Sequence, residues 1–209
     1  MNRKLVGILI FENVEVLDFC GPFEVFSVTR LNEEKRREEL SPFNVFLIAE
    51  TESPVMATGG MRVLPDYDLD SCPHVDILVV PGGWGTRKEM NNERLLKWIA
   101  DRAGRVETLT SVCTGSLMLG NAGLLDGKRA TTHWRSLDWM QELFPKVTVE
   151  KQLHFVEDGT LFTSAGISAG IDMSLKVVAR YHGEAIARAT ARHMEYPFPE
   201  TDERRITLA

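Results

Sequence analysis

Residues 106–123 read VETLTSVCTGSLMLGNAG, an apolar run that ends at a cysteine and continues through a small-residue turn into a second apolar run. The spacing of Val106, Leu109 and Val112 predicts a buried strand, and residues 117–122 fit the apolar face of a short helix. Cys113 therefore lies where a strand turns into a helix. A comparable turn in the G-x-S-x-G elbow exposes a nucleophile at the carboxyl edge of a sheet.

A thiol at this turn has two interpretations. The unpaired N–H groups of a helix's first turn favour thiolate over thiol, which makes the sulfur a better nucleophile. Free cysteines are also among the most frequently buried residues, so an inert core cysteine fits the same pattern. The local pattern does not decide between the two.

Composition restricts the class of protein. The chain has 209 residues, 44% of them hydrophobic, which is enough for one well-buried domain, expected to span residues 1–209. Its net charge of -6 argues against a nucleic-acid surface, and Lys35–Arg37, placed among four glutamates, is interpreted as the solvated end of a helix. We expect no nucleic-acid partner.

Compartment and cofactors follow from the cysteines and the apolar segments. Three cysteines without C-x-x-C spacing suggest neither disulfides nor a zinc site, so we expect a cytoplasmic protein that needs no metal or cofactor. Residues 1–11 are better explained as a first strand than as a signal peptide, and no segment approaches the roughly 20 apolar residues of a membrane span. We expect no membrane partner.

Strand and helix patterns alternate along the chain. Strands are predicted over residues 4–11, 43–49, 76–80, 106–112, 129–132, 147–156 and 160–163, with a hairpin or edge excursion over 54–64. Helices are predicted to open at Gly21-Pro22, with Phe23 and Phe26 inward, and over residues 87–102, 115–122, 133–143, 171–181 and 184–194. The alternation predicts an α/β fold with a flavodoxin-like, doubly wound and mostly parallel sheet flanked by helices, and a nucleophile elbow at Cys113.

Four loops should leave the carboxyl ends of the strands. They bring together Asp18, the Gly82-Gly83 amides, Cys113 and Thr114. A thiolate, a carboxyl group that shuttles its proton, and amides that stabilise negative charge would suffice for nucleophilic chemistry. Repulsion from a charged sulfur would keep Asp18 protonated. Each feature also has an ordinary structural explanation: Asp18 as a helix cap, and the glycines as a tight turn.

The other candidate residues are weaker. His133 is the one histidine expected near this edge, although a helix-start histidine making ordinary hydrogen bonds fits as well. The remaining histidines, at 74, 154, 182 and 193, have no metal-ligand spacing and are interpreted as surface or packing residues. Trp134 and Trp139 are interpreted as core.

Four segments resemble the ThiJ/PfpI superfamily, whose members are related to class I glutamine amidotransferases. They are LDFCGPFEVF (17–26), DILVVPGGWG (76–85), SVCTGSLMLGNAGLLDGKRATTHW (111–134) and TSAGISAGIDMSL (163–175). The third segment is most similar to isonitrile hydratases and to the sensor domains of AraC-type regulators.

The resemblance implies roles for individual residues. Cys113 would be the nucleophile, Asp18 the general acid or base, and Thr114 a neighbour that orders the site. Gly82 and Gly83 would form an oxyanion-type pocket.

Further substrate contacts are expected from His133 and, in the loop after residue 163, from Gly166 and Ile167. Because Thr114 stands where protease-like members have histidine, the sequence argues against a peptidase. A homodimer and a small-molecule electrophile are the implied partners.

Three functions fit these residues. The first is an isonitrile hydratase-like lyase, in which the Cys113 thiolate adds to an isocyanide carbon, Asp18 protonates the adduct, and water releases an N-substituted formamide. The second is glyoxalase or deglycase chemistry on methylglyoxal. The third is a non-catalytic redox or ligand sensor in which Cys113 oxidises.

Overall fold

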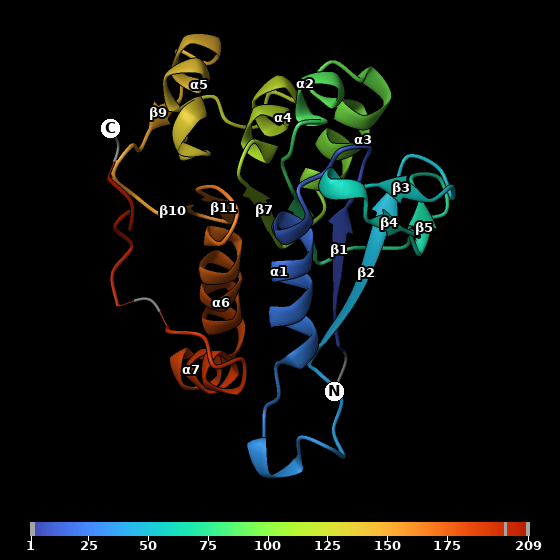
Figure 1. Ribbon diagram of the computed structural model, residues 1–209, viewed down its shortest axis with the longest axis vertical. Helices are drawn as coiled ribbons and strands as arrows, with labels where there is room; N and C mark the ends of the chain where they lie inside the picture. The colour runs from blue at the N-terminus through green and yellow to red at the C-terminus, as the bar shows by residue number, and fades with distance from the viewer. Residues whose placement is uncertain (1–2, 199, 208–209) are drawn as a thin grey trace.

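A seven-stranded sheet forms the centre of the molecule. The computed structural model describes residues 3–198 and 200–207, and its sheet has the order β10-β11-β7-β6-β1-β2-β5 (Figure 1). All neighbours run parallel except β10 and β11. The strands are β1 (Lys4–Leu9), β2 (Phe43–Ala49), β5 (Tyr67–Asp68), β6 (Ile77–Val80), β7 (Thr108–Val112), β10 (Phe155–Asp158) and β11 (Leu161–Ser164). The predicted doubly wound, mostly parallel sheet is confirmed.

Helices cover both faces of this sheet. From β1 the chain moves one way to β2, whereas from β6 it moves the other way to β7 and β11, so right-handed crossovers place α1 and α3 on opposite faces. Figure 1 shows α1, α6 and α7 grouped together and α2, α3 and α4 grouped elsewhere. The helices are α1 (Val16–Val28), α2 (Thr86–Glu89), α3 (Glu93–Ala103), α4 (Gly115–Asn121), α5 (Leu137–Leu143), α6 (Ala169–His182) and α7 (Glu184–His193).

The direction of winding reverses between β1 and β6, and this reversal positions the site. Strands β6 and β7 are buried along their whole length, as expected of strands covered on both faces. In doubly wound sheets, ligands bind beyond the carboxyl ends of the strands next to such a reversal. The loops after β1, β6 and β7 meet at that place.

Two small sheets accompany the large one. β3 (Val55–Met56) and β4 (Arg62–Val63) pair antiparallel around the short helix η2 (Thr58–Gly60), so the predicted hairpin is confirmed, although it forms a sheet of its own. β8 (Arg129–Ala130) pairs with β9 (Thr148–Val149) in parallel. The short helix η3 (Trp134–Ser136) then precedes α5.

The prediction that Gly21-Pro22 opens the first helix is wrong. α1 already begins at Val16, with Pro22 in its interior and Asp18 in its first turn. Proline has no N–H to donate to the carbonyl of Asp18, yet the helix continues because the face that carries Pro22 also buries Phe19 and Phe26 in the core, while Phe23 is exposed. Tertiary burial thus outweighs a local helix-breaking signal.

The predicted helix over residues 87–102 is in fact two helices. α2 ends at Glu89, and α3 starts afresh after Asn92, whose side-chain oxygen accepts a hydrogen bond from Leu95 N at 3.2 Å. Asparagine is among the preferred N-cap residues, which explains the new start.

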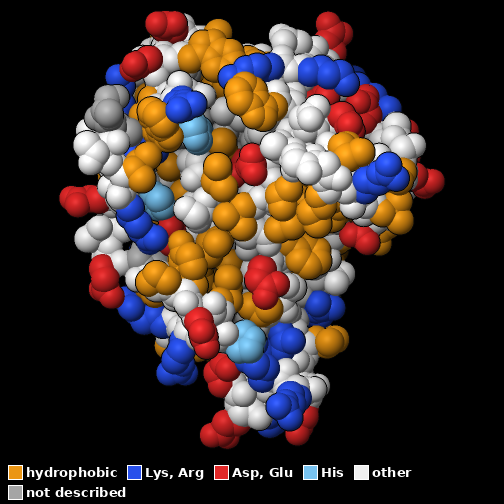
Figure 2. All heavy atoms as spheres, in the orientation of Figure 1, with side chains coloured by type: hydrophobic (Ala, Val, Ile, Leu, Met, Phe, Trp, Pro, Cys, Tyr) orange, Lys and Arg blue, Asp and Glu red, His pale blue; other side chains and the backbone are white. Residues whose placement is uncertain are grey.

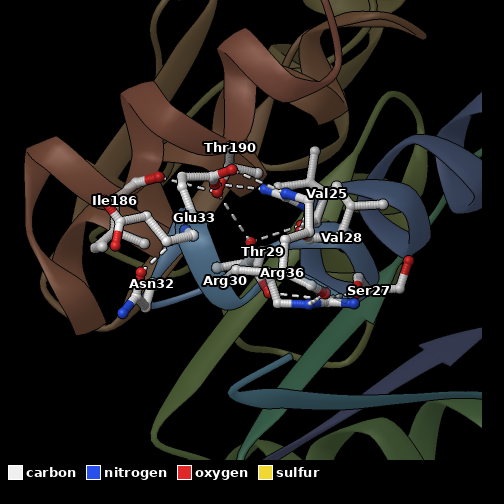
Figure 3. A network of polar contacts seen from close by, with 11 residues as sticks. Val25, Ser27, Val28, Thr29, Arg30, Asn32, Glu33, Arg36, Ile186 and Thr190 are labelled. Carbon is white, nitrogen blue, oxygen red and sulfur yellow. Dashed lines mark hydrogen bonds and ion pairs between the residues drawn. The ribbon is translucent and has the colours of Figure 1, made fainter. Parts of the chain in front are cut away.

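The end of α1 is fastened by arginines of the following segment (Figure 3). Arg36, next to the short helix η1 (Glu33–Lys35), donates to Val28 O at 2.6 Å and pairs with Glu33. Arg30 donates to the carbonyls of Ser27 and Thr29. The interpretation of Lys35–Arg37 as merely solvated is therefore wrong for Arg36, because the terminal carbonyls of α1 need donors.

On the face shown in Figure 2, hydrophobic side chains gather over its middle, and charged side chains lie mostly around the rim. Across the described ranges, the structure contains no helix with both the length and the apolar character needed to cross a membrane.

Candidate active site

Cys113 occupies a strained turn between β7 and α4. Its φ of 57° is in the left-handed region, which residues other than glycine rarely adopt. The Cys113 N–H donates to Ser164 O and Ala165 O, both at 3.2 Å, and its carbonyl accepts the Thr132 hydroxyl at 2.9 Å. These contacts hold the strained backbone in place, and the turn has the geometry of a nucleophile elbow.

The turn also requires Gly115. A Cβ at this position would lie 2.0 Å from Val80 O at the end of β6. The elbow and the loop after β6 can therefore approach each other only because residue 115 has no side chain.

Asp18 is buried behind the cysteine. Its Oδ2 accepts the Gly82 N–H at 3.0 Å, whereas Oδ1 makes no hydrogen bond of regular geometry within the described chain. Burial raises the pKa of Asp18 to about 8, and the Glu15 charge adds to the rise, although the Gly82 amide and the Cys113 thiol oppose it. The carboxyl group is thus protonated at neutral pH, but through burial and not through the expected repulsion from a charged sulfur.

The expectation that the helix N-terminus favours a Cys113 thiolate is not supported. Burial raises the pKa of the Cys113 thiol well above its usual value, and the Asp18 charge raises it further. The Thr114 amide and hydroxyl act in the other direction. Desolvation of a sulfur that is only 6% exposed outweighs the field of α4, a helix of seven residues.

Thr114 links the elbow to the loop after β6. Its hydroxyl accepts the Gly83 N–H at 3.1 Å and lies 2.9 Å from the Thr86 hydroxyl at the start of α2. The Gly82 and Gly83 amides therefore donate to Asp18 and Thr114 respectively. Their role as an oxyanion pocket stays a prediction, and it requires these amides to share or exchange their acceptors.

His133 lies beside the cysteine, in contact with the loop after β11. A Cβ on Gly166 would lie 2.1 Å from His133 Cδ2, so the imidazole ring packs directly on this glycine. His133 Nδ1 accepts the Arg135 N–H at 3.3 Å. Burial and the Arg135 charge lower the pKa of His133, which makes a neutral ring with its proton on Nε2 the form consistent with these contacts.

Ile167, which follows Gly166 in the chain, is a second strained residue. Its φ of 60° is exceptional for a β-branched side chain. Because Cys113 and Ile167 both line one cavity, two unfavourable backbone conformations meet at the same place. Such strain concentrates at functional sites.

The cavity above Cys113 has a volume of about 450 Å³, within the range of small-molecule sites. Of the residues predicted for the site, Gly83, Cys113, Thr114, His133 and Ile167 line it, while Asp18, Gly82 and Gly166 lie behind this first layer. The sequence analysis missed six lining residues: Glu15, Trp84, Arg87, Arg135, Ser136 and Trp139. Trp84 could have been predicted from the sequence, because a tryptophan between two glycines at the end of a strand is not required by the turn itself.

The interpretation of Trp134 and Trp139 as core holds in part for Trp139, which packs against the core, and is wrong for Trp134. Both are half-buried, and Trp139 lines the cavity. Each stacks with an arginine, which lets one ring face remain at the surface.

The other histidines lie elsewhere. His154 is buried 2.8 Å from Asp172, His182 packs on Phe43, and His74 contacts Asp76. Within residues 3–198 and 200–207, no three His, Cys, Asp or Glu side chains group in a way that could hold a metal ion.

A doubly wound sheet with a strained cysteine elbow beside a buried acid defines a class of α/β proteins organised around one cysteine at the carboxyl edge of the sheet. The profile of the DJ-1/PfpI family matches residues 4–180, and the chain belongs to this family.

Two curated relatives cover nearly the whole chain. An isonitrile hydratase from Pseudomonas putida is 37% identical over 94% of this chain and 81% of its own length. The HTH-type transcriptional regulator GbdR from Pseudomonas aeruginosa is 31% identical over 99% of this chain, which spans only 55% of the regulator.

Solved structures agree with the fold. A THiJ/PfpI family protein from Pseudomonas syringae has a TM-score of 0.82 at 30% identity, covering 97% of this chain and 79% of that one. DJ-1beta from Drosophila melanogaster has a TM-score of 0.78 at 18% identity, with 94% and 100% covered, and shows the fold alone.

Proposed function

We propose that the protein hydrates an isocyanide to an N-substituted formamide, with Cys113 as nucleophile and Asp18 as proton donor and acceptor. The observation that carries the proposal is the pair itself: a protonated, fully buried carboxyl group beside the thiol at the base of a small-molecule cavity. Similarity to an isonitrile hydratase over most of the chain supports it.

The raised pKa values of both groups determine how the reaction begins. Because neither group is ionised at neutral pH, a free thiolate is not the resting nucleophile. Asp18 gives its proton to the terminal isocyanide carbon while it takes the proton of Cys113, whose sulfur bonds to the same carbon. The product is a thioimidate, R–N=CH–S–Cys113, and Asp18 is protonated again.

Water completes the cycle. It adds to the thioimidate carbon while a proton passes to the nitrogen, and the C–S bond then breaks to release R–NH–CHO as the thiol regains its proton through Asp18. The neutral His133, which lines the cavity, would orient the water or the developing oxygen anion through its Nε2–H. Thr114 holds the elbow and the loop after β6 in register.

The test is the release of formamide from benzyl isocyanide. Activity should fall at least about 10³-fold in Cys113→Ala and Asp18→Asn, because each variant removes a group that takes part in bond formation or proton transfer. Cys72→Ala, which alters a thiol in the loop before β6, is the matched control and should keep its activity. Formamide release that survives Cys113→Ala would refute the proposal.

A second candidate is ligand sensing without turnover, favoured by the similarity to GbdR over 99% of this chain. In that case benzyl isocyanide, or a related small molecule, would bind and raise the melting temperature, and no formamide would form.

The quaternary state follows from the resemblance and the compartment from the cysteines, and both stay predictions. Hydrophobic side chains gather over the middle of the face in Figure 2, and Phe23 of α1 is exposed; both observations are consistent with a homodimer. Three free thiols are consistent with the reducing cytoplasm. Light scattering tests the first of these predictions.

A further inference from the structure

The cavity above Cys113 is lined by two arginines that have no acidic partner. Arg87 follows the first residue of α2, and Arg135 lies in η3, so they come from separate parts of the chain. Across residues 3–198 and 200–207, no carboxylate oxygen lies within 4.0 Å of either guanidinium group. Elsewhere on the surface, arginines such as Arg129 and Arg180 pair with glutamates.

In place of acidic partners, both guanidinium groups have cation–π contacts with tryptophan rings. Arg87 Cζ lies 4.6 Å from the ring centroid of Trp84 and 5.7 Å from that of Trp139, and Arg135 Cζ lies 4.8 Å from that of Trp134. Stacking orients a planar guanidinium group through its face and leaves the N–H donors at its edge free. A free guanidinium edge is the group that proteins use to bind carboxylates with two parallel hydrogen bonds.

The remaining charges leave the cavity positive. Glu15 is the one carboxylate that lines it, Asp18 behind the cysteine is protonated, and the lowered pKa of His133 makes that ring neutral. The cavity lining thus has two cations and one anion, an excess of positive charge, whereas the whole chain has a net charge of -6. Such a site attracts an anion that the rest of the surface repels.

We propose that this cavity selects substrates that carry a carboxylate on an aromatic body, with Arg87 and Arg135 binding the carboxylate and Trp84 and Trp139, the two tryptophans in the cavity lining, packing on the aromatic ring. The electrophilic carbon of such a substrate meets Cys113 at the opposite end. The anion subsite itself is independent of the reaction, whereas the identification of the electrophile as an isocyanide rests on the proposed function.

The first experiment tests the subsite without catalysis. Cys113 is alkylated with 4-(bromomethyl)benzoate and with 4-(bromomethyl)benzamide, two reagents that share the same leaving group and differ in charge. Peptide mass spectrometry gives the two rate constants for Cys113 apart from those of Cys20 and Cys72. The ratio of the benzoate rate to the benzamide rate measures the preference for the anion.

We expect the double variant Arg87→Gln/Arg135→Gln to lower this ratio about tenfold or more, the size of a lost charge-assisted hydrogen bond. The benzamide rate should stay within about twofold, which shows that the elbow is intact. Arg105→Gln is the matched control: Arg105 is exposed and precedes β7, at the end of the sheet opposite to Cys113. A ratio that is the same in all three proteins would overturn the proposal.

The second experiment separates the two proposals. Hydration of 4-(isocyanomethyl)benzoate is compared with that of its benzamide analogue, and kcat/KM should favour the benzoate in the wild type but not in the double variant. If neither isocyanide is hydrated while the alkylation ratio still depends on the arginines, the proposed function fails and the subsite stands. If both analogues are hydrated at equal rates and the alkylation ratio is unchanged in the double variant, the proposed function stands and the anion subsite is refuted.

Discussion

Asp18 shows how one buried carboxyl group couples chemistry to stability. The side chain has no exposed surface, and its pKa of about 8 results from burial more than from any neighbour. A carboxyl group that stays protonated at neutral pH can donate a proton to a carbon, which an ordinary exposed aspartate cannot do. The same desolvation makes the residue unfavourable for folding.

We therefore predict that Asp18→Asn stabilises the protein at alkaline pH while it abolishes catalysis. The unfolded chain loses the Asp18 proton near pH 4, whereas the folded protein keeps it up to about pH 8, so the folding stability that depends on this group falls as pH rises through that window. At pH 8 the variant should gain on the order of 2 to 4 kcal/mol, or about 5–10 °C in Tm.

Thermal unfolding at pH 4 and at pH 8 checks this prediction. At pH 4 the two proteins should melt within about 2 °C of each other, because Asp18 is protonated in the folded state and about half protonated in the unfolded chain, which changes the free energy of unfolding by only about 0.5 kcal/mol. An equal difference in Tm at the two pH values would show that the carboxyl group is ionised in the folded protein.

The residues that the sequence could predict are those fixed by local geometry. Cys113 could be found because a change from strand to helix period marks the elbow, and Asp18 because it stands near the end of another strand at the same edge. Arg87, Arg135 and Trp139 could not be found, because their approach to Cys113 depends on how α2 and the η3–α5 segment are placed. The prediction of a Cys113 thiolate was wrong for a related reason. Burial raises the pKa of the thiol more than the helix N-terminus lowers it, and burial depends on the whole fold.

At the scale of elements, the inner strands of the sheet were predictable, whereas the single strand predicted over residues 147–156 is wrong, since β9 and β10 are separate strands in different sheets. β2 matches its predicted span, and β6 and β7 match within two residues at each end, because strands buried on both faces are continuous apolar runs. Helix limits were less predictable where a polar residue or a proline interrupts the pattern, as at Asn92 and Pro22. Caps and tertiary burial, rather than composition, decide those limits.

The end of α1 offers a prediction at this scale. Arg36 donates to Val28 O in the last turn and pairs with Glu33, and its side chain is 17% exposed. Arg36→Ala should lower the free energy of unfolding by about 1.5 kcal/mol, because a terminal helix carbonyl loses its charged donor. Urea denaturation measures the change.

Arg37→Ala is the control for this prediction, since the neighbouring arginine is exposed and should change the free energy by less than about 0.5 kcal/mol. Equal effects from the two substitutions would mean that the bond to Val28 does not stabilise α1.

Across the whole molecule, residues 200–207 connect parts that the sequence pattern leaves separate. This segment runs along the β10 edge of the molecule (Figure 1), where His154 N donates to Asp202 O and Arg204 N to Gln152 O, each at 2.7 Å. Arg204 also donates to Thr132 O, and Thr132 in turn donates to the Cys113 carbonyl. No periodicity predicts such contacts, because they join residues distant in sequence through irregular backbone.

The ion pair between Arg205 and Asp172 gives the strongest test of this segment. Asp172 is fully buried in α6, and its Oδ1 receives Arg205 Nη2 at 2.8 Å and the Tyr196 hydroxyl at 3.0 Å. Arg205→Met should lower the free energy of unfolding by about 2 kcal/mol, because a buried carboxylate loses its cation, although the partial exposure of Arg205 reduces the loss below that of a fully buried pair. In the control Arg188→Met, which breaks pairs with two exposed glutamates and a contact with the Phe198 ring, the loss should stay below about 1 kcal/mol. If the two variants unfold at the same urea concentration, the Arg205–Asp172 pair does not fasten the segment after α7 to α6, and this segment is a surface attachment.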